Sequence, residues 1–279
     1  MFPDVEPLLR EEREFVHALG GHSVAFHGGT LVVHERLPFP RFNFIQELDV
    51  RRDRASAFFE RALDYYFQRA LRPSIRVAEP VPAPTAGFLQ QFGFRPRREP
   101  LVLLRSSGPV APARTDGHPT VRRAEAEELD TLVRMLAEPA ESEELRRLIE
   151  AAWSRPGSAE EFVPLVAERD GAIAATAIVH RFHEIAGIHG VATVPPARGK
   201  GAATALVEFA VRAPAVRSAT VWWLPTEHPA LATHLQELGF TPLTQYRVHD
   251  LPPGAELALP AARTSGPPLW RPPRPPSKE

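Results

Sequence analysis

A run of small and basic residues, 198–203 (RGKGAA), separates an apolar segment from a segment with helical periodicity. Backbone amides in the first turn of a helix lack partners within the helix, and the helix dipole makes that end positive, so anions bind there. The small members leave room for a pyrophosphate to reach these amides: Gly199, Gly201, Ala202 and Ala203. The basic members are Arg198 and Lys200. We interpret the run as an anion-binding loop rather than an ordinary tight turn, because small residues and cations coincide where anion binding requires them.

The segment around this run predicts a mixed α/β fold. Some stretches carry apolar residues at helical spacing, whereas others are short apolar runs bounded by turn signals such as Asp170-Gly171. We expect strands at 120–124, 162–168, 172–180, 185–194, 219–224 and 246–249. We expect helices at 125–137, 142–153, 201–212 and 229–238, the second capped by Ser142. Three consecutive strands in this order indicate an antiparallel meander.

An internal repeat extends this fold to the first part of the chain. The segments 89–94 (LQQFGF) and 235–240 (LQELGF) lie 146 positions apart. The same offset aligns the strand 74–77 with 220–223 and the helical stretch 54–69 with 200–215. Each half then continues into an apolar strand, at 101–104 in the first and at 246–249 in the second. The chain is therefore predicted to be a tandem duplication.

Composition shifts divide the chain into four parts. The first copy spans 1–105 and the second 120–251, and the segment 106–119, which lacks hydrophobic periodicity, is predicted to link them. Residues 252–279 form a proline-rich tail that we expect to be disordered. The alternative for the tail is an extended polyproline ligand.

The pattern Arg198-x-x-Gly201-x-Ala203 resembles the acyl-CoA pyrophosphate motif Q/R-x-x-G-x-G/A of the GNAT superfamily of N-acetyltransferases. The order of predicted elements over residues 120–251 is similar to that superfamily as well. The resemblance implies an α/β fold with a mixed sheet, acetyl-CoA as cosubstrate without a metal, and acetyl transfer to a primary amine. It also implies that four strand residues expose backbone groups to the pantetheine arm: Val191, Ala192, Thr193 and Val194.

The first copy departs from the motif. The 146-residue offset places Asp53 where the second copy has Gly199, and Ala55 where it has Gly201. A carboxylate beside a diphosphate is repelled, and a Cβ reduces the backbone freedom of the loop. We therefore expect a degenerate first copy that shapes the acceptor cleft, the alternative being two active sites.

Acyl transfer to an amine needs a base, because an ammonium has no lone pair. His189 lies nine residues before Arg198, and histidine as a residue type, with an unperturbed pKa near 6.5, suits this role. Glu184, at the start of the same strand, is the second candidate, and the third possibility is that neither residue acts.

The resemblance also implies a tyrosine that protonates the leaving thiolate, four residues before the Gly239-Phe240 pair. Leu235 occupies that position, so the usual acid is missing. His228 occupies a position where the family often has an asparagine. It could replace the tyrosine as the proton donor, or it could simply begin the helix that Pro229 continues.

The acceptor is expected to be a small molecule or a protein amine. The acidic segment 138–144 (EPAESEE) favours a cationic acceptor, although acidic residues also stabilise the first turn of a helix. Direct attack is expected because the chain has no cysteine and no Ser-His pairing stands out. The alternative functions are a non-catalytic acyl-CoA-binding regulatory module and, third, a peptidyl or aminoacyl transferase.

The composition of the chain limits its possible partners and its location in the cell. The 33 basic and 34 acidic residues give a net charge of -1, which argues against nucleic acid as a partner. With 43% hydrophobic and 24% charged residues, the chain has the composition of a folded globular protein. The charged N-terminal segment lacks a signal-peptide pattern, and no apolar stretch approaches the roughly 20 residues that span a bilayer. We expect a cytoplasmic protein that has no membrane partner, and the oligomeric state is left open.

Overall fold

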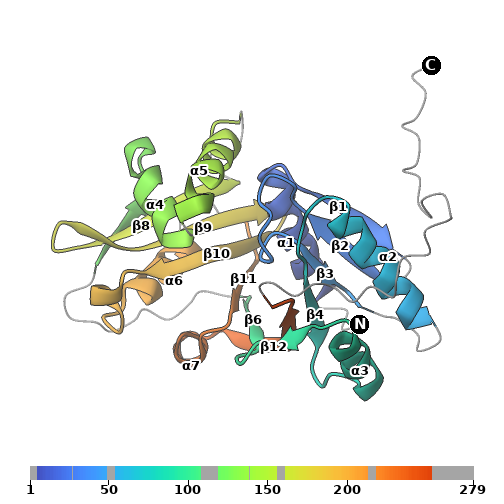
Figure 1. The fold of residues 1–279 in the computed structure, drawn as a ribbon. Helices are drawn as coiled ribbons and strands as arrows, with labels where there is room; N and C mark the ends of the chain where they lie inside the picture. The colour runs from blue at the N-terminus through green and yellow to red at the C-terminus, as the bar shows by residue number, and fades with distance from the viewer. Residues whose placement is uncertain are drawn as a thin grey trace.

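The computed structural model describes residues 5–26, 28–48, 54–107, 119–137, 139–155, 161–212 and 218–252. These residues form one mixed sheet of 12 strands with helices on both faces (Figure 1). The fold class expected from the sequence is confirmed. Most of the predicted linker and nearly all of the proline-rich tail lie outside the described residues.

The second half follows the predicted order of elements. Its strands are β7 (Thr120–Arg123), β8 (Phe162–Arg169), β9 (Ala172–Phe182), β10 (Ile185–Thr193), β11 (Val221–Thr226) and β12 (Thr241–Asp250). Its α-helices are α4 (Leu129–Leu136), α5 (Pro139–Trp153), α6 (Ala202–Arg212) and α7 (Pro229–Glu237).

Several boundaries in this half differ from the prediction, and two of them have a clear physical reason. The helix predicted to begin at a Ser142 cap instead begins at Pro139, because proline is well suited to the first turn, where its missing N–H is not needed. The last strand begins at Thr241 rather than at Tyr246, because pairing with a neighbouring strand extends it through Pro242 and Thr244.

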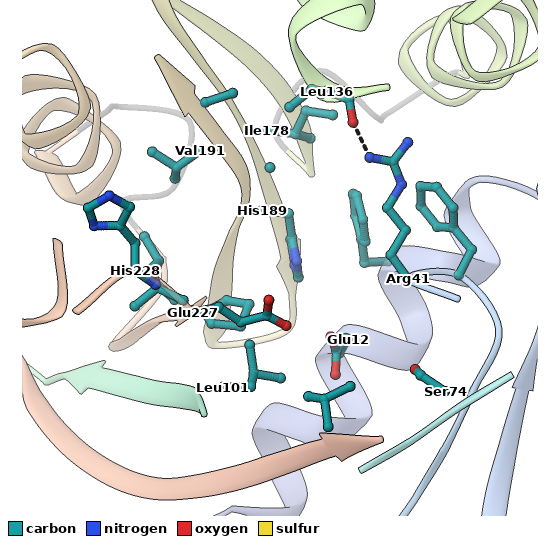
Figure 2. Close-up of a pocket in the computed structure, with 18 of the residues that line it drawn as sticks. Glu12, Arg41, Ser74, Leu101, Leu136, Ile178, His189, Val191, Glu227 and His228 are labelled. Atoms are coloured by element: carbon teal, nitrogen blue, oxygen red, sulfur yellow. Dashed lines mark hydrogen bonds between the residues drawn. The ribbon is translucent and has the colours of Figure 1, made fainter. Parts of the chain in front are cut away.

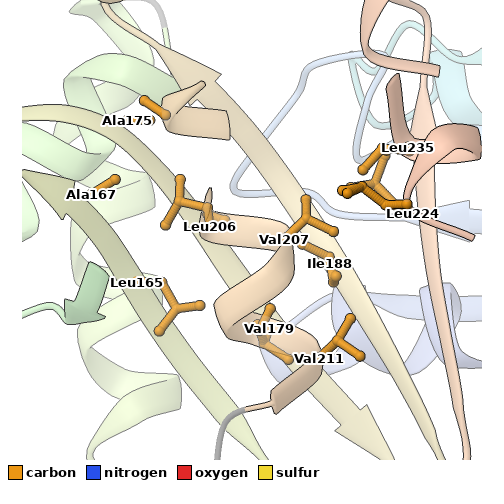
Figure 3. Packing of buried hydrophobic residues seen from close by; sticks show 14 of the residues in the cluster. Leu165, Ala167, Ala175, Val179, Ile188, Leu206, Val207, Val211, Leu224 and Leu235 are labelled. Atoms are coloured by element: carbon orange, nitrogen blue, oxygen red, sulfur yellow. The ribbon is translucent and has the colours of Figure 1, made fainter. Parts of the chain in front are cut away.

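Alternating residues of the central strands supply two cores, one on each face of the sheet. Val179 of β9 faces α6, whereas its neighbour Ile178 packs with α4 and α5 on the other face. On α6, apolar residues at helical spacing, including Leu206 and Val207, pack against the strand residues below them (Figure 3). Helix α6 is thereby held at the end of β10, where the anion-binding loop precedes it.

The first half repeats most of these elements, with shorter strands. Its strands are β1 (His22–Phe26), β2 (Gly29–Val33), β3 (Phe44–Gln46), β4 (Ser74–Ala78), β5 (Arg95–Pro96) and β6 (Leu101–Ser106). Its helices are α1 (Glu6–Ala18), α2 (Ala55–Phe67) and α3 (Ala83–Gln91). The 146-residue offset carries α3 onto the bounds of α7 and places α2 on α6 and β4 on β11. The duplication expected from the sequence is confirmed.

The two halves exchange their last strands. The sheet order is β1-β2-β3-β4-β12-β6-β11-β10-β9-β8-β7. Strand β6 of the first half pairs with β11 of the second, and β12 of the second half pairs with β4 of the first. The exchanged strands also pair with each other, with Gln245 opposite Val102. Neither half therefore contains all the strands of its own part of the sheet, and the boundaries at 105 and 120 stay a prediction about the repeated units.

Helix α1 also crosses between the halves. It precedes the strands of the first half, yet it lies against β9 and β10 of the second, in the middle of the molecule (Figure 1). Its inward face carries the apolar residues Leu8, Phe15 and Val16 together with two buried carboxylates, Glu11 and Glu12.

Candidate active site

A wedge opens between two parallel strands of the second half. Strands β10 and β11 pair only over residues 185–187 and 221–223, although β10 continues to Thr193 and β11 to Thr226. A bulge in β10 between His189 and Ala192 shifts its register with β9, and Gly190 within the bulge has a φ of 61°. The two strands thus separate beyond Gly187, and backbone groups between them are available to a ligand.

The larger cavity, about 1040 Å³, lies at the wide end of this wedge. Nine of the ten residues predicted to bind the cofactor line this cavity: Val191, Ala192, Thr193, Arg198, Gly199, Lys200, Gly201, Ala202 and Ala203. Val194 is not in the lining and packs against the core instead. Gly199 and Gly201 have φ values of 72° and 82°, which favour glycine.

The charge of this cavity matches a polyphosphate. Arg169, Arg198 and Lys200 line it, and none of the described lining residues carries a carboxylate. Arg169 donates a hydrogen bond to the carbonyl of Lys200 at 3.0 Å, which ties the loop to the end of β8. Three residues of the first turn of α6, Ala202, Ala203 and Thr204, line the same cavity, and amides in a first helical turn have no partners within the helix. The arrangement has the features that bind a diphosphate.

A second cavity, about 670 Å³, lies between the two halves (Figure 2). Its lining includes Glu12 and Ser74 from the first half and His189 and Glu227 from the second. The side chain of Arg41 crosses this space and donates a hydrogen bond to the carbonyl of Leu136 (Figure 2). Six residues line both cavities: Met135, Val191, Ala192, Thr226, His228 and Leu231. The two cavities therefore meet along the wedge.

His189 lies where the second cavity approaches the wedge. Its side chain is 7% exposed, and its ring stacks on Phe15 of α1 with 4.0 Å between the ring centroids. Its Nε2 lies 3.1 and 3.2 Å from the two carboxylate oxygens of Glu11.

Glu11 is fully buried and is the acceptor for three ring N–H groups. Besides His189, Nδ1 of His180 lies 2.7 Å from one oxygen, and the indole N–H of Trp223 donates to the other at 2.7 Å. Burial opposes ionisation of Glu11, but the two neighbouring imidazoles outweigh it and hold the pKa of the carboxyl at about 2. The carboxylate is therefore charged at neutral pH.

A carboxylate and two imidazoles within 4.8 Å also match a divalent metal by ligand type. The distances are those of hydrogen bonds, and one carboxylate oxygen is occupied by the Trp223 N–H, which is a donor and never a ligand. A Cβ on Gly187 would lie 2.3 Å from Glu11 and from His189, so the group is packed against the strand. We interpret the three residues as a hydrogen-bonded group.

The other two predicted catalytic residues lie apart from each other. Glu184 is exposed in the turn between β9 and β10, at the opposite end of β10 from the loop, and lines neither cavity. His228 lines both cavities and also caps α7, because its Nδ1 accepts a hydrogen bond from the amide of Leu231 at 3.4 Å. That bond leaves the neutral ring with its proton on Nε2. Leu235, in place of the expected tyrosine, is buried in the core.

Residues 138–144, predicted to attract a cationic acceptor, are described in part. Glu143 forms ion pairs with Arg146 and Arg147, and Glu144 pairs with Arg36 and Arg147. Neither lines the second cavity. Glu138 and the side chain of Glu141 lie outside the described residues, and the cationic acceptor stays a prediction.

The sequence analysis missed Glu11, His180 and Arg169. A signal for Glu11 exists, because apolar residues at 8 and 15 define a helix face that also includes position 11. A carboxylate on such a face needs buried partners. His180 and Arg169 carry no comparable local signal, since their roles depend on which segments the sheet brings beside them.

Acid should destabilise the protein through Glu11. A carboxyl with a lowered pKa contributes stability above its ordinary pKa of 4.5, and this contribution is lost as the pH falls toward about 2. We expect the free energy of unfolding to fall by about 3 kcal/mol more in the wild type than in Glu11→Gln between pH 5 and pH 2. Urea titrations followed by tryptophan fluorescence measure this difference. Equal losses in the two proteins would contradict the assignment of an ionised Glu11.

Residues 126–240 match the profile of the Acetyltransferase (GNAT) family. The match lies within the second half of the chain, which is therefore similar to this family over these residues. No curated protein sequence matches the chain.

Solved structures share the fold over most of the chain. A GCN5-related N-acetyltransferase from Kribbella flavida is 18% identical, with a TM-score of 0.64 over 88% of this chain and 95% of that one. A GCN5-related N-acetyltransferase from Sphaerobacter thermophilus is 15% identical, with a TM-score of 0.60 over 82% and 79% of the two chains. A tandem GNAT protein from the clavulanic acid biosynthesis pathway is 17% identical, with a TM-score of 0.52 over 81% and 79%. At these identities the likeness establishes the fold alone.

Among the described residues, no helix is long and apolar enough to cross a bilayer.

Proposed function

We propose that the second half binds acetyl-CoA in the larger cavity and transfers its acetyl group directly to a primary amine held in the second cavity. The observation that carries the proposal is the junction of the two cavities at the β10–β11 wedge. A diphosphate at the loop places the rest of a CoA molecule along this wedge, so that its thioester reaches the space beside His189 and His228. The family match supports the acyl-transfer class.

Two histidines act in this proposal, His189 by taking a proton and His228 by donating a hydrogen bond. His189 takes a proton from the ammonium, and the freed lone pair of the amine attacks the thioester carbonyl. The nitrogen of the adduct loses its second proton to solvent, the carbon–sulfur bond breaks, and the electron pair of that bond leaves on the CoA thiolate. The neutral ring of His228 carries its proton on Nε2 and is placed to donate a hydrogen bond that stabilises this thiolate, which then takes a proton from solvent; Leu235 has no group that can make this bond.

The charged groups that line the second cavity indicate which charges the acceptor carries. Three carboxylates, Glu12, Glu99 and Glu227, share it with three guanidinium groups, Arg41, Arg76 and Arg97. Two of the carboxylates are paired with arginines of the same lining, Glu12 with Arg76 and Glu227 with Arg97. A lining of both signs fits an acceptor that carries an ammonium and an acidic group, such as an amino acid, as well as the cationic amine expected from the sequence. We propose the cytoplasm as the site of action.

Substitutions at Gly201 test the cofactor site. We expect Gly201→Asp to bind acetyl-CoA about 10- to 100-fold more weakly than Gly201→Asn does. Calorimetry measures the two dissociation constants. The two side chains have the same shape and both tolerate a positive φ, so the difference isolates the repulsion between a carboxylate and the diphosphate. Gly87→Asp makes the same substitution in open space on α3, away from the cavity, and is the control. It should bind acetyl-CoA as tightly as the wild type does. Equal affinity of the Asp and Asn variants would contradict the site.

The wild type should bind one acetyl-CoA per chain. Release of CoA in the presence of amino acids, diamines and amino sugars then tests transfer. Binding without transfer to any of these amines would instead favour the non-catalytic acyl-CoA-binding module.

A further inference from the structure

One residue of the first half lies against the proposed base of the second. We infer that Glu11 is a positioning residue for the proposed reaction: it holds His189 in the Nε2–H tautomer and leaves Nδ1 free to accept the proton of the amine. The inference rests on the proposed function and deepens it, because it makes the reactive centre a joint product of the two copies.

The tautomer follows from the hydrogen bonds. Both Glu11 oxygens lie within 3.2 Å of Nε2 of His189, and a carboxylate accepts hydrogen bonds without donating them, so Nε2 carries the proton. In the neutral ring, Nδ1 then bears the lone pair. Nδ1 has no hydrogen-bond partner in the described part of the chain, and it is not fully buried, which leaves it open to the cavity that His189 lines.

Packing prevents the ring from turning away. Phe15 stacks on one face of His189 with the two rings 4° from parallel, and Trp223 meets it edge-on with 5.6 Å between centroids. The backbone of Gly187 lies directly beneath, where a Cβ would be 2.3 Å from both Nε2 and Glu11. Two further donors, His180 and Trp223, hold the Glu11 carboxylate itself. The carboxylate is thus fixed before any substrate binds.

The corresponding position of the first copy has no such arrangement. At the 146-residue offset, Asn43 of the first copy aligns with His189 of the second. Asn43 is fully buried. Its amide bonds only to backbone groups, accepting from the amide of His34 and donating to the carbonyls of Leu37 and Phe39. The first copy has therefore kept a structural residue where the second has an ionisable one, while it supplies Glu11 to its neighbour.

The proton step is balanced within these residues. The N–H bond of the ammonium breaks and its proton joins Nδ1, which converts His189 to an imidazolium and leaves the amine with a lone pair. The positive ring then lies 3.1 Å from the charged Glu11, which stabilises it. The proton passes to solvent after the product leaves.

Other charged groups face the same space and remain unchanged in the test. Glu12 of α1 pairs with Arg76 of β4, and His180 of β9 shares the Glu11 carboxylate. Further groups line the cavity from the loops: Arg41, Arg97, Glu99, Glu227 and His228. Comparison of two proteins that differ only at position 11 isolates the contribution of Glu11.

The experiment compares wild type, Glu11→Gln and Glu14→Gln, the last a partly exposed glutamate on the same helix. We expect Glu11→Gln to lower kcat about 10- to 100-fold and to move the acidic limb of the kcat–pH profile about one unit lower, because loss of the negative charge makes the imidazolium easier to deprotonate. Its acetyl-CoA affinity should stay within about twofold of the wild type, since Glu11 is not in the larger cavity. Glu14→Gln should match the wild type throughout.

A spectroscopic readout keeps the inference testable if Glu11→Gln does not fold. In the wild type labelled with ¹⁵N-histidine, the His189 ring should be the Nε2–H tautomer at pH 8, with assignment from His189→Asn. A protonated Nδ1, an unmoved acidic limb in a folded Glu11→Gln, or activity that disappears on treatment with a chelator would each overturn the inference. A wild type that acetylates no amine would instead refute the proposed function, and the tautomer measurement would still stand.

Discussion

An asparagine at position 189 should lower the turnover number for amine acetylation by roughly 100- to 10,000-fold at neutral pH, the range that general-base catalysis contributes. Asparagine is the residue that the first copy carries at the same place, and it has no group that takes a proton. Affinity for acetyl-CoA should change little, because His189 lines the second cavity and not the larger one. Steady-state kinetics across pH measure both quantities, and the acidic limb of the kcat profile should flatten.

Two further variants serve as controls for this result. His189→Gln places an amide nitrogen near the position of Nε2 and can still donate to Glu11, so it separates loss of the base from loss of the buried hydrogen bond. We expect it to be as inactive as His189→Asn but more stable. Glu184→Gln, in an exposed turn, should retain wild-type turnover. A loss confined to Glu184→Gln would transfer the role of base to that residue, and a loss below about tenfold in all variants would indicate deprotonation by water.

Neither half should fold when it is produced alone. Residues 119–252 lack β6, which pairs with both β11 and β12, and they lack α1, whose Glu11 accepts hydrogen bonds from three buried side chains. Residues 5–107 lack β12, which pairs with β4. Unpaired strand edges and unsatisfied buried donors each destabilise a domain of modest stability. We expect both fragments to be insoluble or to lack cooperative unfolding by circular dichroism.

Co-expression of the two fragments provides the matched control. The exchanged strands should join them into a 1:1 complex that elutes as one species and binds one acetyl-CoA. A fragment 119–252 that unfolds cooperatively by itself and binds acetyl-CoA as tightly as the full chain would show that the strand exchange and α1 are dispensable.

Local patterns were sufficient to predict most of the helices and strands and to propose the anion-binding loop. Small residues, cations and a following amphipathic helix are all neighbours in sequence, so the chemistry of 198–203 can be inferred before the chain is folded. The duplication is likewise visible in sequence, because copies keep their spacing, and α3 and α7 bear it out. The boundary of α5 could not be predicted well, since a proline is compatible with both a loop and a first helical turn.

The exchange of β6 and β12 was decided only in three dimensions. Both strands lie at equivalent ends of similar halves, and either could pair with β4 or with β11 by pattern alone. The partners of His189 were decided in the same way. The sequence by itself determined a duplicated α/β fold, and it predicted an anion-binding loop with a histidine nine residues before it. Only the tertiary structure placed Glu11, 178 residues away, against that histidine, because contacts between distant segments depend on how helices and strands pack and not on residue spacing.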